Sequence, residues 1–286
     1  MTSLRAELIR LGRWPTTWVL SGTWLLLNLS FGYLFPYLSY RDGSSPVPAG
    51  RVADSVAPAG QLARVLPLHA PVSMVQGLPM FGGALVLILG ATAVASGYGW
   101  GTWKNIFTAG PRRASVLAGT VAALGVVVVA LVLATLGVDL LASVVIANLE
   151  HQPVTWPALA AVAQGVGAAL LIGGVWAMAG ALLGTLTRGP ALAVGLGLVW
   201  ALVVENLLRG VGSLLGPVEA ITKGLPGTAA GSLAGALGAQ AEGDPNGTPG
   251  VMTVLSGGTS VLVLAVYVVA FIAVTMAITH RRDLAG

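Results

Sequence analysis

Long apolar runs alternate with short polar stretches along this chain of 286 residues. Each run carries few or no charged side chains and approaches or exceeds the roughly 20 residues that a helix needs to cross a bilayer. Runs of this length and purity are typical of membrane spans. We predict six spanning helices, over residues 14–38, 78–96, 115–149, 158–186, 191–208 and 259–279. The third run is longer than a bilayer requires, so we expect it to tilt or to project beyond the lipid.

The first 13 residues follow a different pattern. Leu4, Leu8 and Leu11 fall at positions i, i+4 and i+7, opposite Arg and Glu side chains. This spacing predicts a helix over residues 1–13 that lies in the membrane interface. The apolar run that follows is too long for the apolar region of a secretory signal peptide, so we assign it to the first span.

Two longer stretches interrupt the apolar pattern. Residues 41–76 are polar and Pro-rich, and we predict a loop there, with a short helix near residues 61–66. Residues 209–257 are Gly-rich and contain four prolines, which break any continuous spanning helix. Irregular backbone is tolerated at membrane depth where protein covers it, so a dip of this outward-side stretch into the membrane stays open.

Composition agrees with this pattern and excludes several classes of protein. The chain is 56% hydrophobic and only 8% charged, against about 25% charged in a soluble domain. It has no cysteine, which excludes disulfides, thiolate metal ligands and thiol nucleophiles. Basic residues are almost all arginine, and Gly, Ala and Val are abundant, a bias that GC-rich coding produces. We therefore expect a multi-pass protein of a bacterial inner (plasma) membrane.

The positions of the basic residues predict the orientation of the spans. Lys and Arg accumulate on the cytoplasmic side of membrane proteins, so the net charge of +4 needs no nucleic acid to explain it. With both termini in the cytoplasm, nine basic residues lie inside and five outside. The inner residues are Arg5, Arg10, Arg13, Lys104, Arg112, Arg113, Arg188, Arg281 and Arg282, and the outer ones are Arg41, Arg51, Arg64, Arg209 and Lys223.

Motifs for common catalytic chemistry are missing from the sequence. No G-x-x-x-x-G-K-[ST] loop surrounds either lysine, so the chain has no P-loop for ATP hydrolysis. There is no H-E-x-x-H zinc motif and no G-x-S-x-G nucleophile elbow. The three histidines, at positions 69, 151 and 280, are far apart in sequence. We therefore predict no catalytic, metal or cofactor site in this chain.

Two acidic residues and two glycine pairs within or beside the spans are noteworthy. Asp139 and Glu205 are costly in lipid, and such groups are functional candidates by default. Arg209 follows Glu205 by one helical turn, so an i, i+4 ion pair is the structural alternative for Glu205. The spacing of Gly180 with Gly184, and of Gly212 with Gly216, permits close helix packing, within the chain in preference to a dimer contact.

The basic link between the second and third spans, residues 97–114, is the most informative segment. Trp100, Trp103, Ile106 and Phe107 occur at helical intervals beside Lys104. A short apolar and basic helix at the cytoplasmic face either lies on lipid or inserts into a groove of a soluble partner. The residues alone leave both alternatives open.

This segment resembles the second cytoplasmic element of ABC-2 type exporter permeases, the transmembrane subunits of a class of ABC transporters. The residues that carry the resemblance are Gly101, Thr102, Lys104, Pro111 and Arg113. The layout of the whole chain is also similar, with an N-terminal interfacial helix, six spans and a broken outward-side stretch after the fifth.

The resemblance implies a homodimer in which each permease seats its cytoplasmic helix on a separate ATPase subunit that holds the ATP and Mg²⁺. Motion of the ATPase pair would pass to the spans through that helix. By analogy, the residues that couple to the ATPase are Thr102, Trp103, Lys104, Asn105, Ile106 and Phe107. The residues expected along the transport pathway are Asn28, Tyr33, Trp200, Glu205 and Asn206.

We therefore expect an all-α polytopic membrane protein, organised as a single transmembrane domain over residues 1–286. Its expected function is ATP-driven export of a hydrophobic or amphipathic compound, such as an antibiotic, a drug or a lipid-like molecule. Two alternatives remain: a polytopic membrane enzyme that acts on lipid, and a membrane sensor or immunity protein that transports nothing.

Overall fold

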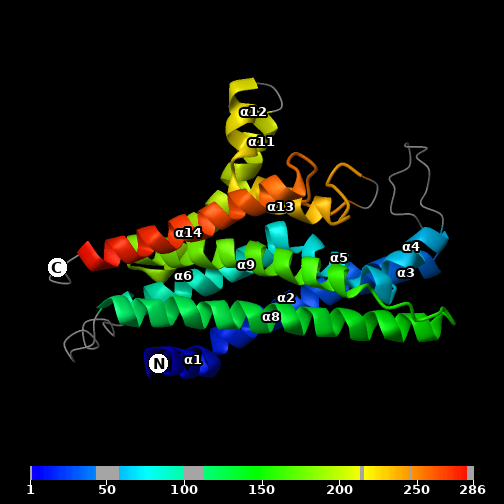
Figure 1. Cartoon of the computed structure of the whole chain (residues 1–286), viewed down its shortest axis with the longest axis horizontal. Helices are drawn as coiled ribbons and strands as arrows, with labels where there is room; N and C mark the ends of the chain where they lie inside the picture. The colour runs from blue at the N-terminus through cyan, green and yellow to red at the C-terminus, as the bar shows by residue number, and fades with distance from the viewer. Residues whose placement is uncertain (1, 43–57, 100–112, 213–215, 245–246, 282–286) are drawn as a thin grey trace.

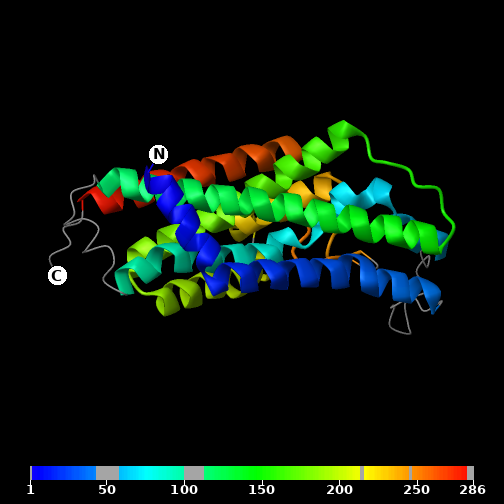
Figure 2. The same ribbon diagram turned by 90° about the horizontal axis from the view of Figure 1, so that it is seen from below.

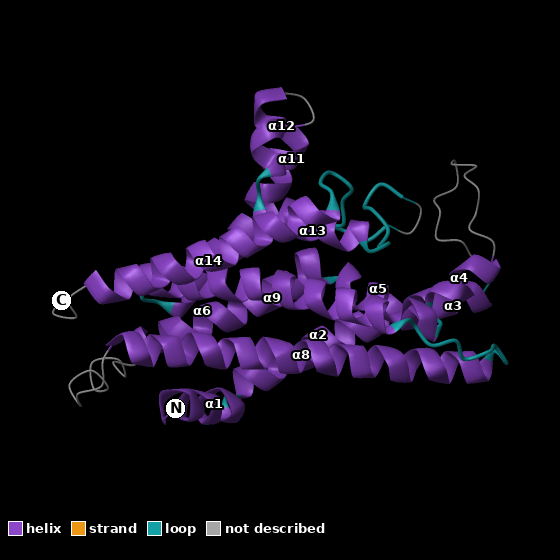
Figure 3. Cartoon of the chain, in the orientation of Figure 1, coloured by secondary structure: helices purple, strands orange, loops and turns teal. Residues whose placement is uncertain are grey.

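The computed structural model describes residues 2–42, 58–99, 113–212, 216–244 and 247–281. These residues form helices joined by short connections, and no strand occurs among them (Figure 3). Six helical stretches of 21 to 35 residues are long and apolar enough to cross a membrane, which confirms the six spans and the all-α class. In chain order these spans 1 to 6 are Pro15–Arg41, Leu78–Tyr98, Ser115–Leu149, Leu159–Thr187, Pro190–Gly212 and Gly257–His280.

Three spans are built from more than one helical piece. Span 1 comprises α2 (Pro15–Leu29), the π-helical turn η1 (Ser30–Leu34) and α3 (Phe35–Arg41). Span 2 comprises the π-helical turn η3 (Leu78–Gly82) and α6 (Gly83–Gly99). Span 5 comprises α10 (Pro190–Leu198), the π-helical turn η4 (Val199–Val204) and α11 (Glu205–Gly212). The widened turns keep the backbone hydrogen-bonded in lipid while they shift the helix face.

The other spans are continuous helices, namely α8 (Arg113–Leu149), α9 (Leu159–Thr187) and α14 (Gly257–Arg281). Spans 1, 2, 3, 4 and 6 run along the long axis of the molecule, whereas the α11 end of span 5 turns away from it (Figures 1 and 2). α1 (Thr2–Arg13) and the last turn of α14 lie at the same end of the bundle, as an even number of spans requires. α11 and α12 (Gly216–Lys223) stand away from the layer that α13 (Pro226–Ala236) and α14 form (Figure 1).

Packing of α6 against α9 forms the centre of the bundle. A Cβ at Gly180 would lie 2.1 Å from the Leu87 oxygen, and one at Gly184 would lie 2.8 Å from the Ala91 oxygen. On the facing helix, a Cβ at Gly90 would lie 2.1 Å from the Ala177 oxygen. Backbones this close exclude larger side chains, so the Gly180 and Gly184 pair serves packing within the chain, as predicted.

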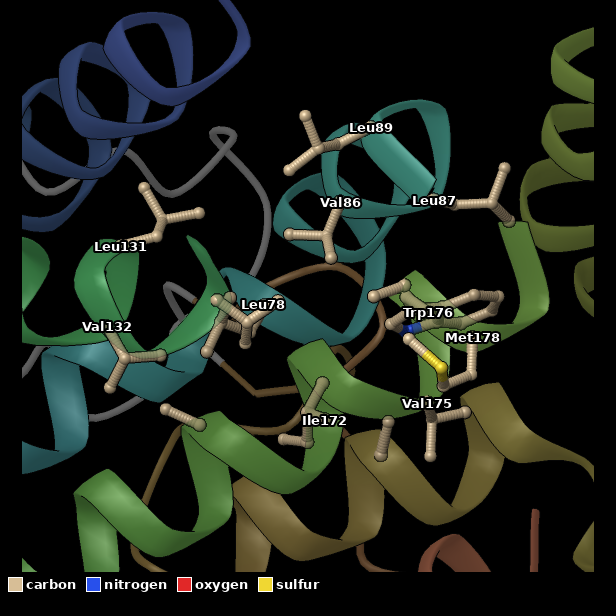
Figure 4. Packing of buried hydrophobic residues seen from close by; sticks show 14 of the residues in the cluster. Leu78, Val86, Leu87, Leu89, Leu131, Val132, Ile172, Val175, Trp176 and Met178 are labelled. Atoms are coloured by element: carbon tan, nitrogen blue, oxygen red, sulfur yellow. The ribbon is translucent and has the colours of Figure 1, made fainter. Parts of the chain in front are cut away.

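Large apolar side chains fill the space next to this backbone contact (Figure 4). Trp176, Met178 and Ile172 of α9 are buried in one cluster with Leu87 and Leu89 of α6. Spans 2, 3 and 4 are the most buried, with half or more of their residues covered, whereas span 6 is only 11% buried. The outer spans 1, 5 and 6 therefore present most of the apolar surface that lipid or a partner covers.

The predicted loop before span 2 is more helical than its composition suggested. It contains α4 (Pro58–Arg64), the 3₁₀ turn η2 (Pro67–His69) and α5 (Ala70–Gln76). The assignment of residues 70–76 to a loop was wrong, since they form the helix α5. Five of its seven residues are buried. After span 5, α13 is buried along most of its length against α14 and η3, so the predicted broken stretch contains one well-covered helix.

Candidate functional site

The predicted ATPase contact, from Thr102 to Phe107, lies outside the described residues. Both helices that flank it are described: α6 ends at Gly99 and α8 begins at Arg113. The surroundings of this segment are therefore described through α6, α8 and the residues that contact these two helices.

α1 binds both flanking helices. Ser3 Oγ donates to the Ser115 oxygen at 3.1 Å, near the start of α8. Arg10 Nη2 donates to the Ala93 oxygen of α6 at 2.8 Å. Ser3 Oγ lies against the backbone of Gly119. A Cβ at Gly119 would be 2.2 Å from Ser3 Oγ, so a larger residue would not fit there. α1 thus joins the ends of spans 2 and 3 on either side of the predicted contact.

α1 packs its apolar face against the core of the bundle. Leu11 is fully buried in the main core, and Leu4 and Leu8 pack against that core, as the i, i+4, i+7 spacing predicted. Arg10 also pairs with the buried Glu7 at 2.6 Å, and its guanidinium lies 5.2 Å from the Trp14 ring centre. The predicted N-terminal helix is therefore present, while its position at a membrane interface stays a prediction.

Polar side chains connect span 1 to span 3 inside the bundle. Trp24 Nε1 donates to Thr135 Oγ1 at 3.0 Å, and one helical turn further Asn28 Nδ2 donates to Asp139 Oδ1 at 2.5 Å. Because 24 pairs with 135 and 28 with 139, the two helices run parallel here. We call Trp24, Thr135, Asn28 and Asp139 the polar ladder.

A buried polar atom without a hydrogen-bond partner in the described part of the chain lies at the end of this ladder that Asn28 and Asp139 form. Asp139 is fully buried, and Tyr33 and Asn28 are almost fully buried. Among the described residues, Asp139 Oδ2 has no hydrogen-bond partner, and the Tyr33 hydroxyl group interacts with Ser73 of α5. Beyond the ladder, Tyr37 Oη donates to Glu150 Oε1 at 2.7 Å and continues the connection to the end of α8.

Span 5 holds a second polar group. Trp200 Nε1 donates to Glu205 Oε1 at 3.0 Å. Arg209 Nε donates to the backbone oxygen of Glu205 at 3.2 Å, and Arg209 Nη2 donates to Asn206 Oδ1 at 2.9 Å. Arg209 thus makes its hydrogen bond to the main chain of Glu205, and its charge also interacts with the Glu205 carboxylate.

The Glu205 carboxylate lies against the start of α13. A Cβ at Gly227, the second residue of that helix, would be 2.0 Å from Glu205 Oε2. The first amides of a helix lack partners within the helix and carry partial positive charge, which favours an anion there. We therefore expect Glu205 to hold α13 against span 5 through this close approach, since its Oε2 makes no hydrogen bond among the described residues.

The five residues predicted along a pathway form two groups. Asn28 and Tyr33 belong to the surroundings of the polar ladder, whereas Trp200, Glu205 and Asn206 bond within span 5 and near α13. Hydrogen bonds among the described residues join neither group to the other. A cavity lined by Trp24 and Thr135 has a volume of about 10 Å³, room for one water molecule and far below a small-molecule site of about 300 Å³.

Several structural residues were missed by reasoning from the sequence. Thr135 and Trp24 were not singled out, nor was Arg10 as the link between α1 and α6. The signal that was present is the matching four-residue spacing of Trp24 with Asn28 and of Thr135 with Asp139. Two polar positions one turn apart in each of two spans can pair twice, provided that the helices are parallel.

Comparisons with known proteins add no relative to this description. No family model matches the chain, and no curated protein matches it. Among the described residues, no three His, Asp or Glu side chains come together to hold a metal ion. The candidate site is thus defined by its geometry alone. At one end of the bundle α1 joins α6 and α8, and within the bundle the polar ladder joins spans 1 and 3.

Proposed function

We propose that this chain is the permease subunit of an ATP-driven exporter of the ABC-2 type. It works as a homodimer in a bacterial inner membrane and moves a hydrophobic or amphipathic compound outward. A separate ATPase subunit binds ATP and Mg²⁺ and grips residues 97–114 from the cytoplasm.

The observation that carries the proposal is the position of α1. Its hydrogen bonds to Ala93 and Ser115 join the two helices on either side of residues 100–112. A force applied to that segment would reach spans 2 and 3 together with α1. This arrangement suits a contact that transmits motion, and the sequence from Gly101 to Arg113 supplies the apolar and basic residues for it.

Apolar surface and the missing P-loop support the same proposal. Spans 1, 5 and 6 leave large apolar side chains exposed, among them Phe31, Val203 and Leu262. The cavity beside the polar ladder is too small for a cargo. A second copy would supply the other wall of a pathway, and a second protein would supply the energy.

The test uses the full chain co-expressed with the ATPase encoded beside it. We expect the pair to copurify in detergent and the permease to stimulate ATP hydrolysis in liposomes. The double variant Trp103→Ala with Phe107→Ala should lose the ATPase from the complex and lower the stimulation at least about tenfold, because two apolar anchors at an interface each contribute 1 kcal/mol or more.

A matched control lies at the opposite end of the bundle. Trp156→Ala with Leu159→Ala removes two exposed apolar side chains of similar size and should leave copurification unchanged. If the ATPase fails to copurify with the unaltered chain, or if the Trp103 and Phe107 variant transports normally, the proposal is wrong.

A further inference from the structure

Asp139 lies within span 3, ten residues before its end at Leu149, and none of its surface is exposed. A charge at such a position is costly, and acidic residues within spans ordinarily pair with a cation or line a water-filled space. Asn28 Nδ2 donates to Asp139 Oδ1 at 2.5 Å. That single neutral donor leaves Oδ2 unpaired among the described residues.

No cation on the surrounding helices compensates Asp139. The elements packed against α8 are α1, α2, η1, η2, α5, α6, α9 and α14. Of these, α2, α5 and α9 carry no titratable side chain. The titratable groups on the others are Arg5, Glu7, Arg10 and Arg13 of α1, Tyr33 of η1, His69 of η2, Tyr98 of α6, and Tyr267, His280 and Arg281 of α14. Tyr33 interacts electrostatically with Asp139, and its neutral phenol does not offset the charge of the carboxylate.

Space at the carboxylate limits what can bind there. The cavity lined by Trp24 and Thr135 is one helical turn away and is not lined by Asp139. A hydrated metal ion needs several oxygen ligands and the room to hold them. A proton needs no volume, and it turns Oδ2 into a donor in the buried region where Tyr33 interacts electrostatically with Asp139.

We propose that Asp139, with Asn28 and Tyr33, forms a proton-binding site between spans 1 and 3. The proton sits on Asp139 Oδ2, Asn28 donates to Oδ1, and Tyr33 Oη is the neighbouring acceptor. Moving span 1 away from span 3 admits water, and the carboxyl group then releases its proton to that water. The contact between the two spans is therefore linked to proton binding, whether or not an ATPase is present.

The direct test is infrared spectroscopy of the full chain in lipid nanodiscs. A protonated carboxyl group has a C=O stretching band that a carboxylate lacks. We expect the unaltered chain to show this band at neutral pH and Asp139→Asn to lose it. The amide keeps the size of the side chain and still accepts from Asn28, so the variant should fold.

Two variants make the assignment specific. Tyr33→Phe removes only the hydroxyl group beside Asp139 and should shift the band without abolishing it, which also tests the proposal should Asp139→Asn fail to fold. Glu150→Gln removes a carboxylate that Tyr37 reaches at the end of α8, and it should leave the band unchanged. A band that is absent from the unaltered chain, or that persists in Asp139→Asn, overturns the proposal.

Stability against pH gives a second readout. In water an Asp ionises near pH 4, so the unfolded chain releases at neutral pH a proton that the folded chain keeps. Stability must then fall as pH rises, because the folded state binds more protons. We expect the melting temperature of Asp139→Asn to fall less steeply with pH than that of the unaltered chain. Equal slopes in Asp139→Asn and the unaltered chain contradict proton binding.

Discussion

Single side chains hold spans 1 and 3 together through few but well-placed contacts. Asn28 and Trp24 each donate to a residue of α8, and Thr135 in turn donates to the Leu131 oxygen at 2.8 Å. Inside a membrane such bonds are worth about 0.6 to 2 kcal/mol, and leaving one partner buried alone adds a penalty. The polar ladder is therefore a specific connection in an otherwise apolar interface.

Asn28→Leu tests the ladder at this scale. The change roughly keeps the volume of the side chain but removes the amide group that donates to Asp139, so it should lower the free energy of unfolding by about 1–3 kcal/mol. Chemical denaturation in detergent measures the loss. Asn148→Leu is the control, because Asn148 is exposed and bonds only to the Val144 oxygen of its own helix. Equal losses in the two variants would contradict a specific role for Asn28.

The glycines of α9 provide a second test. Gly180→Ala places a Cβ against the Leu87 oxygen and should destabilise the chain by about 1–3 kcal/mol through overpacking. A Cβ at Gly167 in the same helix meets no atom within 4 Å. Gly167→Ala should therefore leave stability unchanged or raise it by up to about 1 kcal/mol, because Ala favours a helix more than Gly does. Thermal unfolding of both variants in one detergent compares them directly, and a stable Gly180→Ala would disprove the tight contact.

At the scale of elements, two helices outside the spans are attached through a few polar contacts. α13 starts against the Glu205 carboxylate, and α1 binds spans 2 and 3 through Arg10 and Ser3. Helices of 11 and 12 residues have little stability of their own in isolation. Their order must therefore come from these contacts and from the apolar faces that they bury.

Gly227→Ala tests the contact at α13. The added methyl group would displace Glu205 Oε2 from the first turn, so amide hydrogen exchange in residues 226–236 should speed up at least about tenfold. Gly195→Ala in α10 serves as control, since a Cβ at that position meets no atom within 4 Å. Unchanged exchange in α13 would show that Glu205 does not fix this helix.

Arg10→Ala tests the attachment of α1. The change removes the bond to the Ala93 oxygen and leaves Glu7 buried without its cation, so the exchange of α1 amides should increase by about tenfold or more. Arg5→Ala on the exposed side of the same helix should have little effect. Similar exchange in both variants would mean that the apolar face of α1 alone holds it.

For the whole molecule, the predicted orientation is open to a direct experiment. The chain contains no cysteine, so a single introduced cysteine reports one position without background. Gln152→Cys, in the exposed turn after α8, should react with an impermeant maleimide in intact cells. Arg5→Cys, on the exposed face of α1, should react only after the cells are permeabilised. The reverse pattern would place both ends of the bundle opposite to the prediction.

The spans and the period of α1 were predictable because hydropathy and helical spacing are local properties. Each of the six runs matches a described helix to within a few residues, and Leu4, Leu8 and Leu11 turn inward as their spacing requires. α5 was missed because a short segment with two polar side chains becomes a helix only when its neighbours bury it.

The amino-acid sequence by itself therefore determined which segments enter the membrane and which glycines allow helices to approach. Only the tertiary structure decided that Asn28 meets Asp139, 111 positions away, and that the Glu205 carboxylate lies against α13 as well as near Arg209. The reason is physical: burial in lipid depends on the composition of one helix, whereas a hydrogen bond depends on the register and rotation of two. Both of those are fixed by the packing of the entire bundle.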